Sequence, residues 1–144
     1  MKKKFASIVI VVLVMLDVCL AAFALSPLVV NLGTITVHGS NDVVVSATLG
    51  SVSGVVSGNT VTFADSSMNV GDVETLTVNV QNIGNLGSNI TGIHISDNSS
   101  GFISIDDGTH YPVAVAVGAT VALTFTVTAV MAGSVTPSIA ISWT

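Results

Sequence analysis

All three basic residues of this chain, Lys2, Lys3 and Lys4, lie at its N-terminus, and none follows in the remaining 140 residues (144 − 4). Beyond Lys4 the eight carboxylates therefore have no lysine or arginine to pair with. The fold must rely on buried apolar side chains and backbone hydrogen bonds. The same lack excludes nucleic-acid binding, which neutralises phosphates with basic side chains. It also excludes sites that hold phosphate or carboxylate with arginine, and electrostatic attraction to an anionic membrane.

Residues 5–24 form an almost wholly apolar run that ends in Ala22-Phe23-Ala24. A basic start, an apolar run and a small-x-small site are the three parts of a secretory signal peptide. We expect residues 1–24 to be removed after Ala24, which leaves an extracellular chain of 120 residues (144 − 24). A run of about 20 apolar residues also suffices to span a bilayer, so a retained anchor is the alternative. Asp17 inside the run argues against permanent insertion. Cys19, the only cysteine, would leave with the signal.

Beyond residue 24 the strongest pattern is a strict alternation of apolar and polar residues. The chain is 50% hydrophobic and only 8% charged. The clearest stripes lie at Leu76, Val78 and Val80, at Val121, Leu123, Phe125 and Val127, and at Ile139, Ile141 and Trp143. This period favours antiparallel strands with one buried face. Further strands are expected at 43–49, 52–56, 60–64, 90–96, 102–105 and 111–117, separated by Gly, Asn and Asp turns. The pattern predicts one all-β domain over residues 38–144, an antiparallel β-sandwich of jelly-roll or immunoglobulin-like kind.

Residues 25–37 form a long, apolar, extended segment at the start of the expected mature chain. Leu28, Val30 and Leu32 share one face, and Gly33 could act as a β-bulge that shifts the phase to Ile35 and Val37. Two interpretations remain open: the segment is the first strand of its own sandwich, or it is a donor strand that fills a groove in the next copy. In the second case Leu28, Val30 and Leu32 would be the inserted side chains. The acceptor groove would then be lined by Leu76, Val78, Val80, Leu123 and Phe125.

The stretch from Met68 to Asn85 has a Gly71-Asp72 turn before a strand that ends in Asn82-Ile83-Gly84. This pattern, with the leader and the character of 25–37, resembles the TasA/camelysin family of biofilm fibre proteins and the archaeal bundling pilins. The resemblance implies a Sec-type signal and a jelly-roll subunit that polymerises by donor-strand exchange.

Candidate chemistry is sparse. His38, His94 and His110 are the only side chains that ordinarily titrate near neutral pH, and His94, between Ile93 and Ile95, is expected on a solvent face. A nucleophile elbow of the Gly-x-Ser-x-Gly type is absent, so we expect no enzyme and no cofactor. The acidic residues Asp97, Asp106 and Asp107 could chelate Ca²⁺. Since Asp is also an ordinary turn residue, we expect no metal.

Two sequons, at Asn89 and Asn98, mark candidate glycosylation sites in a secreted chain. Taken together, these patterns predict a structural subunit of an extracellular filament whose partner is its own copy, with no nucleic acid and no small-molecule substrate. The alternative is a monomeric adhesive or binding module, held at the cell envelope by an uncleaved N-terminal helix.

Overall fold

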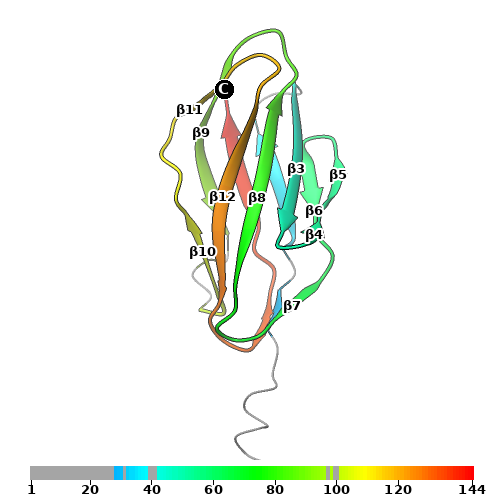
Figure 1. The fold of residues 1–144 in the computed structure, drawn as a ribbon, viewed down its shortest axis with the longest axis vertical. Coiled ribbons are helices and arrows are strands. Elements are labelled where there is room, and N and C mark those ends of the chain that lie inside the picture. Colours follow the sequence, from blue (N-terminus) through cyan, green and yellow to red (C-terminus); the bar gives the residue numbers. More distant parts are fainter. Residues whose placement is uncertain (1–27, 31, 39–41, 97, 99–100) are drawn as a thin grey trace, which may run out of the picture.

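The computed structural model describes residues 28–30, 32–38, 42–96, 98 and 101–144. All regular structure in these ranges is β-strand, arranged as two large sheets that pack face to face (Figure 1). The all-β sandwich expected from the sequence is confirmed. The predicted signal helix and the cleavage after Ala24 lie outside the described residues. Within the described ranges, no helix has the length and apolar character needed to cross a bilayer.

The first sheet has five strands and is antiparallel throughout. Its order is β10 (Ile103–Asp107), β12 (Thr120–Ala129), β8 (Val73–Asn82), β3 (Val43–Leu49) and β4 (Val52–Ser53). The two longest strands, β8 and β12, lie at its centre, and Leu76 pairs with Phe125 across them. Their alternating apolar residues all face the second sheet, because successive side chains of a strand point to opposite faces.

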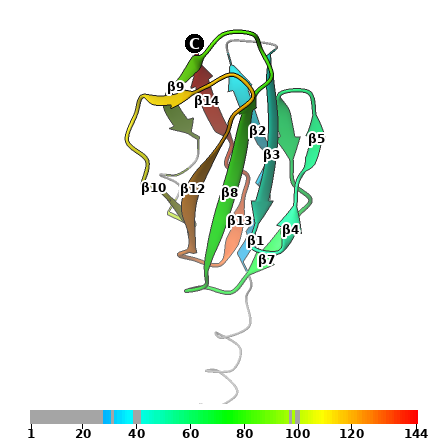
Figure 2. The same cartoon turned by 45° about the horizontal axis from the view of Figure 1, so that its top comes forward.

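The second sheet has six strands. Its order is β11 (Val113–Val115), β9 (Ser88–Ile95), β14 (Ile139–Trp143), β2 (Thr34–His38), β6 (Thr60–Thr62) and β5 (Val55–Ser57). A small third sheet consists of β13 (Gly133–Val135), β1 (Leu28–Val30) and β7 (Ser66–Met68), and Figure 2 shows these three strands at the lower end of the molecule. The pairs β1–β13 and β2–β14 are parallel, and the other strand pairs of the described residues are antiparallel, as expected for an antiparallel sandwich.

The core between the two large sheets is apolar, and Asn82 is the only buried polar residue among those described. The five residues predicted to line a groove, Leu76, Val78, Val80, Leu123 and Phe125, are all at most 1% exposed. Burying one such side chain contributes roughly 1.5–3 kcal/mol. The core therefore stabilises the fold without the ion pairs that the sequence cannot provide.

The predicted strand at 52–56 is wrong as a single element. The chain leaves the first sheet after β4 and enters the second at β5, and Gly54 lies at the crossing. A Cβ at Gly54 would overlap a methyl of Val61, so only glycine lets the backbone pass this close to the core. Two further strands, β7 and β13, were not expected from the sequence. Asp106 and Asp107, which the sequence placed in a turn, end strand β10.

Candidate assembly site

The N-terminal segment occupies a central position, not an edge, in two sheets. Strand β2 lies between β14 and β6, and β1 lies between β13 and β7. In this single chain the segment thus completes its own sandwich, which is the first of the two interpretations left open by the sequence. The expected domain boundary at residue 38 falls at the end of β2, inside the sheet.

A β-bulge divides this segment into its two strands. Leu28 pairs with Gly133, an offset of 105 (133 − 28), whereas Ile35 pairs with Ile139, an offset of 104 (139 − 35). One extra residue therefore lies on the N-terminal side between the two pairings. Gly33 lies there and donates its backbone N–H to the Pro137 carbonyl at 3.0 Å. This one-residue difference agrees with the change of phase expected at Gly33.

The bulge changes which residues of the segment face the core. Leu32 is buried before it, and Ile35 and Val37 are buried after it, with exposures of 2%, 2% and 0%. Of the predicted donor residues, Leu32 thus lies in the core. For Leu28 and Val30, only the backbone pairing is described. Ile35 and Val37 were not among the predicted donor residues, although the phase shift at Gly33 was the signal that pointed to them.

The upper end of β2 is fixed by Asn59 of the β5–β6 turn. Asn59 donates its side-chain amide to the Val37 carbonyl at 2.7 Å, and Val37 donates its backbone N–H to the Asn59 carbonyl at 3.0 Å. These bonds extend the β2–β6 pairing by one position beyond Thr36 and Thr60. The last core residue of the segment is therefore held on both sides, by β14 and by Asn59.

Asn82 organises the loops at the same end of the molecule. It is 1% exposed, and its amide nitrogen donates to the carbonyls of Leu86 at 2.8 Å and of Val115 at 3.1 Å. Its side-chain oxygen accepts the backbone N–H of Gly84 at 2.9 Å. From the sequence, Asn82 was expected only at the end of a strand, with no buried role. The cue to its burial is its position in the apolar stripe of β8.

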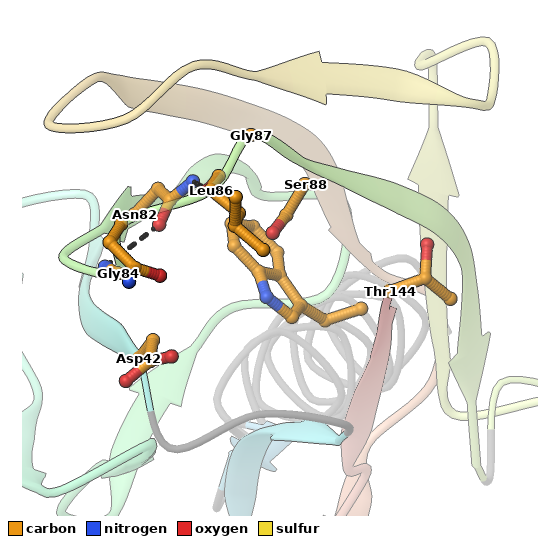
Figure 3. A pocket seen from close by; sticks show the side chains of 9 residues that line it. Asp42, Asn82, Gly84, Leu86, Gly87, Ser88 and Thr144 are labelled. Carbon is orange, nitrogen blue, oxygen red and sulfur yellow. Dashed lines mark hydrogen bonds between the residues drawn. The ribbon is translucent and has the colours of Figure 1, made fainter.

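A hollow of about 250 Å³ lies beside Asn82. Figure 3 shows Asn82, Gly84 and Leu86 along one side of it, with Asp42 and Thr144 at other points of its lining. Asp42 is the only residue of the lining with an ionisable side chain, and the Asn82 amide is already used by the loop. Since ligand sites bring several polar groups to one point, this hollow is not a good candidate for chemistry.

The three histidines are exposed, and His94 lies on the solvent face of β9 as predicted. Within the described ranges, His, Cys, Asp and Glu side chains do not gather in groups of three or more. Of the calcium candidates, Asp97 is outside the described residues and Asp106 is exposed. Asp107 accepts the Thr109 backbone N–H at 3.0 Å and the Tyr111 hydroxyl at 2.9 Å. Asp107 therefore stabilises a turn, as the alternative interpretation of this residue proposed.

Burial, and then the hydrogen bond to Asp107, raise the pKa of the Tyr111 phenol well above its ordinary value. The phenol is consequently a neutral donor to the Asp107 carboxylate over the whole range of ordinary pH. Its role is to fix the chain between β10 and β11, and nothing in its surroundings activates it for proton transfer.

The two sequon asparagines differ in what their amides do. Asn89 is exposed on β9, next to the buried Ile90. Asn98 is also exposed, but its amide nitrogen donates to the Ile105 carbonyl at 3.0 Å and its oxygen accepts the Ile105 N–H at 2.6 Å. The Asn98 side-chain amide thus makes the two hydrogen bonds to Ile105 that the backbone of a neighbouring strand would make.

Comparisons of the chain with protein-family models, with curated proteins and with solved structures give no match.

Proposed function

We propose that this chain is a non-enzymatic structural subunit of an extracellular filament that assembles with its own copies by exchange of the N-terminal strand. The observation that carries the proposal is the central position of residues 28–38, between β13 and β14 on one side and β6 and β7 on the other. Withdrawal of this segment would leave unpaired strands along both sides of a gap and would expose apolar residues of the core. Such a gap is what an extended strand of another copy fits.

Exchange requires no new contacts. The neighbours of β1 and β2 all come from residue 60 onwards, so they can accept the same strand from any copy of the chain. The exchanged and unexchanged forms differ only at the connector between β2 and β3, residues 39–42. The balance between them therefore depends on that connector and on protein concentration.

The connector also limits the arrangement of the copies. Five Cα–Cα steps lead from His38 to Val43, and they span at most about 18 Å when fully extended. The end of β2 in the acceptor must therefore lie close to the start of β3 in the donor, and both strand ends are at the upper end of the sandwich (Figure 2). Exchanging copies consequently lie with their upper ends adjacent. If a twofold axis relates the copies, each copy fills the groove of the other and assembly stops at a dimer. If a screw axis relates them, each copy fills the groove of the next and assembly continues into a filament.

The experiment that tests this function combines negative-stain microscopy with thermal melts of the secreted protein over about a hundredfold range of concentration. Mass action makes the melting temperature of an exchanged assembly rise with concentration. Filaments together with a rising melting temperature would support the proposal. Monodisperse particles with a constant melting temperature would contradict it.

A second candidate function is a monomeric adhesive or binding module retained at the cell envelope. It is favoured by the fact that β1 and β2 are fully paired within their own chain. Leu28 pairs with Met68 of β7 at the lower end of the sandwich, whereas the C-terminus lies at the upper end (Figure 1). N-terminal sequencing separates the two candidates: Leu25 as the first residue supports the secreted subunit, and an intact lysine-bearing terminus supports the anchored module.

A further inference from the structure

The two large sheets end in four edge strands, β10 and β4 in one and β11 and β5 in the other. An edge strand presents unpaired backbone groups, so soluble proteins usually block it with charge, proline, a bulge or a covering segment. These four edges differ in whether such a block is present.

Three edges carry a block or offer little to pair with. The Asn98 amide covers the backbone of Ile105 in β10, and Asp106 and Asp107 follow in the same strand. Strand β11 begins directly after Pro112, and β4 has only two residues. Another chain would find no long, neutral, open strand at these three edges.

The fourth edge, β5, is also short, but it carries no charge, no proline and no covering side chain. Val55 is 73% exposed and Val56 is 46% exposed, and Val52 of the neighbouring β4 is 40% exposed. One side of β5 pairs with β6, and the described chain provides no strand for its other side. Val56 pairs with Val61, which is fully buried, so Val56 lies on the core-facing side of the sheet.

The absence of charged residues around this edge indicates which partner fits it. The chain has a net charge of −5, yet residues 43–64 contain no Asp, Glu, Lys, Arg or His. Two copies of an acidic protein repel each other wherever their carboxylates face one another. At the β4–β5 edge they can meet without such a juxtaposition, because each contributes only valine, serine, threonine and backbone groups.

We propose that residues 52–57, the β4–β5 edge, form a self-association surface at which two copies pair their β5 strands antiparallel about a twofold axis. The same surface of both copies makes the contact, so the interface is self-complementary and closes at two. The pairing satisfies the open backbone edge and buries the valines of both copies. It does not depend on strand exchange, since β6 separates β5 from β2.

The surface is small, because β5 has three residues. We therefore expect weak pairing between isolated copies and much stronger lateral pairing between copies that are already linked in an assembly, where many such contacts act together.

The experiment compares the secreted wild-type protein with Val55→Lys by sedimentation velocity at several concentrations. The control is Val73→Lys, which adds the same charge at a strand position that is 61% exposed but lies on β8. We expect the dissociation constant of the dimer to rise roughly tenfold or more in Val55→Lys, since the twofold brings two lysines together, and to stay unchanged in the control. Thermal melts verify that both variants are folded. Equal association of all three proteins would overturn the proposal.

A single-cysteine variant tests the geometry. Cys19, the only native cysteine, lies in the expected leader, so Val56→Cys provides one thiol in the mature chain. Opposite residues of an antiparallel pair have Cβ atoms roughly 4.5–5.5 Å apart, close to what a disulfide requires. Oxidation should yield a covalent dimer for Val56→Cys and none for Val73→Cys, and equal yields would contradict pairing at β5. Dimers that Val55→Lys abolishes, found without filaments, would contradict filament assembly by strand exchange alone. Filaments that do not associate laterally would contradict edge pairing alone.

Discussion

Gly33 and Pro137 are joined by a 3.0 Å backbone hydrogen bond at the point where the N-terminal strand shifts register by one residue against the C-terminal strand. The two ends of the described chain thus run parallel along the length of the sandwich, first as β1 beside β13 and then as β2 beside β14. The shift at Gly33 accompanies a change of the buried positions, from Leu32 before it to Ile35 and Val37 after it.

Replacement of Gly33 should destabilise the sandwich. A Cβ at this position would lie 2.9 Å from the Thr136 Cγ2, so in Gly33→Ala the Thr136 side chain or the backbone beside it must shift. We expect a loss of about 1–3 kcal/mol in the free energy of unfolding, measured with urea. Gly92→Ala is the control, because a Cβ there meets nothing within 4 Å. An equal loss in both variants would show that the close approach at Gly33 is not the cause.

Asn82→Ala should be among the more damaging substitutions at the upper end. It removes three hydrogen bonds and leaves the polar groups of Leu86, Val115 and Gly84 without that partner. At about 0.5–1.5 kcal/mol for each bond, we expect a loss of roughly 2–4 kcal/mol in urea unfolding. Asn85→Ala, an exposed change in the same loop, should cost under about 0.5 kcal/mol. A small effect at Asn82 would mean that the loop is held by its backbone alone.

The sequence predicted local structure well where the pattern was long and regular. The strand at 43–49 agrees with β3 to the residue, and the stripes of β8 and β12 identify the centre of the first sheet. The break between β4 and β5 was missed because Val52 to Val56 reads as one apolar strand. What divides it is the packing of Gly54 against Val61, a contact distant in sequence.

The candidate site was predictable only in part, for a related reason. The change of phase at Gly33 could be inferred from the sequence, and Leu32, predicted as an inserted side chain, is buried in its own chain. The central position of the segment could not be predicted from the sequence. The alternation of apolar and polar residues shows which face of a strand is buried, and it does not show which strands lie beside it. The parallel pairing of the chain ends and the short, polar strand β7 follow from those tertiary contacts alone.

Glycosylation should distinguish the two sequons. The Asn89 side chain is exposed on β9, whereas the Asn98 amide pairs with the backbone of Ile105. We expect mass spectrometry of the secreted protein to find a glycan at Asn89 and not at Asn98. Asn89→Gln should remove the added mass, and Asn98→Gln should leave it. A glycan at Asn98 would mean that its pairing with β10 is dispensable.

Alkaline pH should destabilise the protein through Tyr111. It is the only tyrosine, and no lysine or arginine follows Lys4, so little else in the mature chain titrates above pH 9. Burial and Asp107 raise the pKa of Tyr111 in the folded state above the unfolded value of about 10. The stabilisation is therefore complete below about pH 10 and declines as pH rises beyond it, because the unfolded chain loses the proton first.

This decline should be absent in Tyr111→Phe. Urea unfolding between about pH 8 and pH 11 provides the comparison, and ultraviolet absorbance of the single tyrosine reports its ionisation directly. At neutral pH the variant should lose about 0.5–1.5 kcal/mol, the contribution of one hydrogen bond. A phenol that ionises at its ordinary pKa in the folded protein would contradict its placement against Asp107.

The N-terminal strand itself provides the most direct test of assembly. Val37 is fully buried, whereas the adjacent Thr36 points to the other face and is half-buried. Val37→Asp should prevent insertion of the strand into any groove, because it buries a carboxylate without a partner. Thr36→Asp introduces the same charge toward solvent and should leave insertion intact. Microscopy should therefore find filaments for Thr36→Asp and none for Val37→Asp.

Peptide complementation then distinguishes a donated strand from a strand that serves only its own chain. A chain that lacks residues 25–34 should have an open groove and regain stability when a peptide of residues 25–38 is added. If the strand is normally donated, the melting temperature of the wild-type protein rises with its own concentration, and excess peptide shortens the filaments by capping their open grooves. If the strand is not donated, the peptide still rescues the truncated chain one to one. The wild-type melting temperature then stays constant with concentration, and added peptide does not change the size of the wild-type particles.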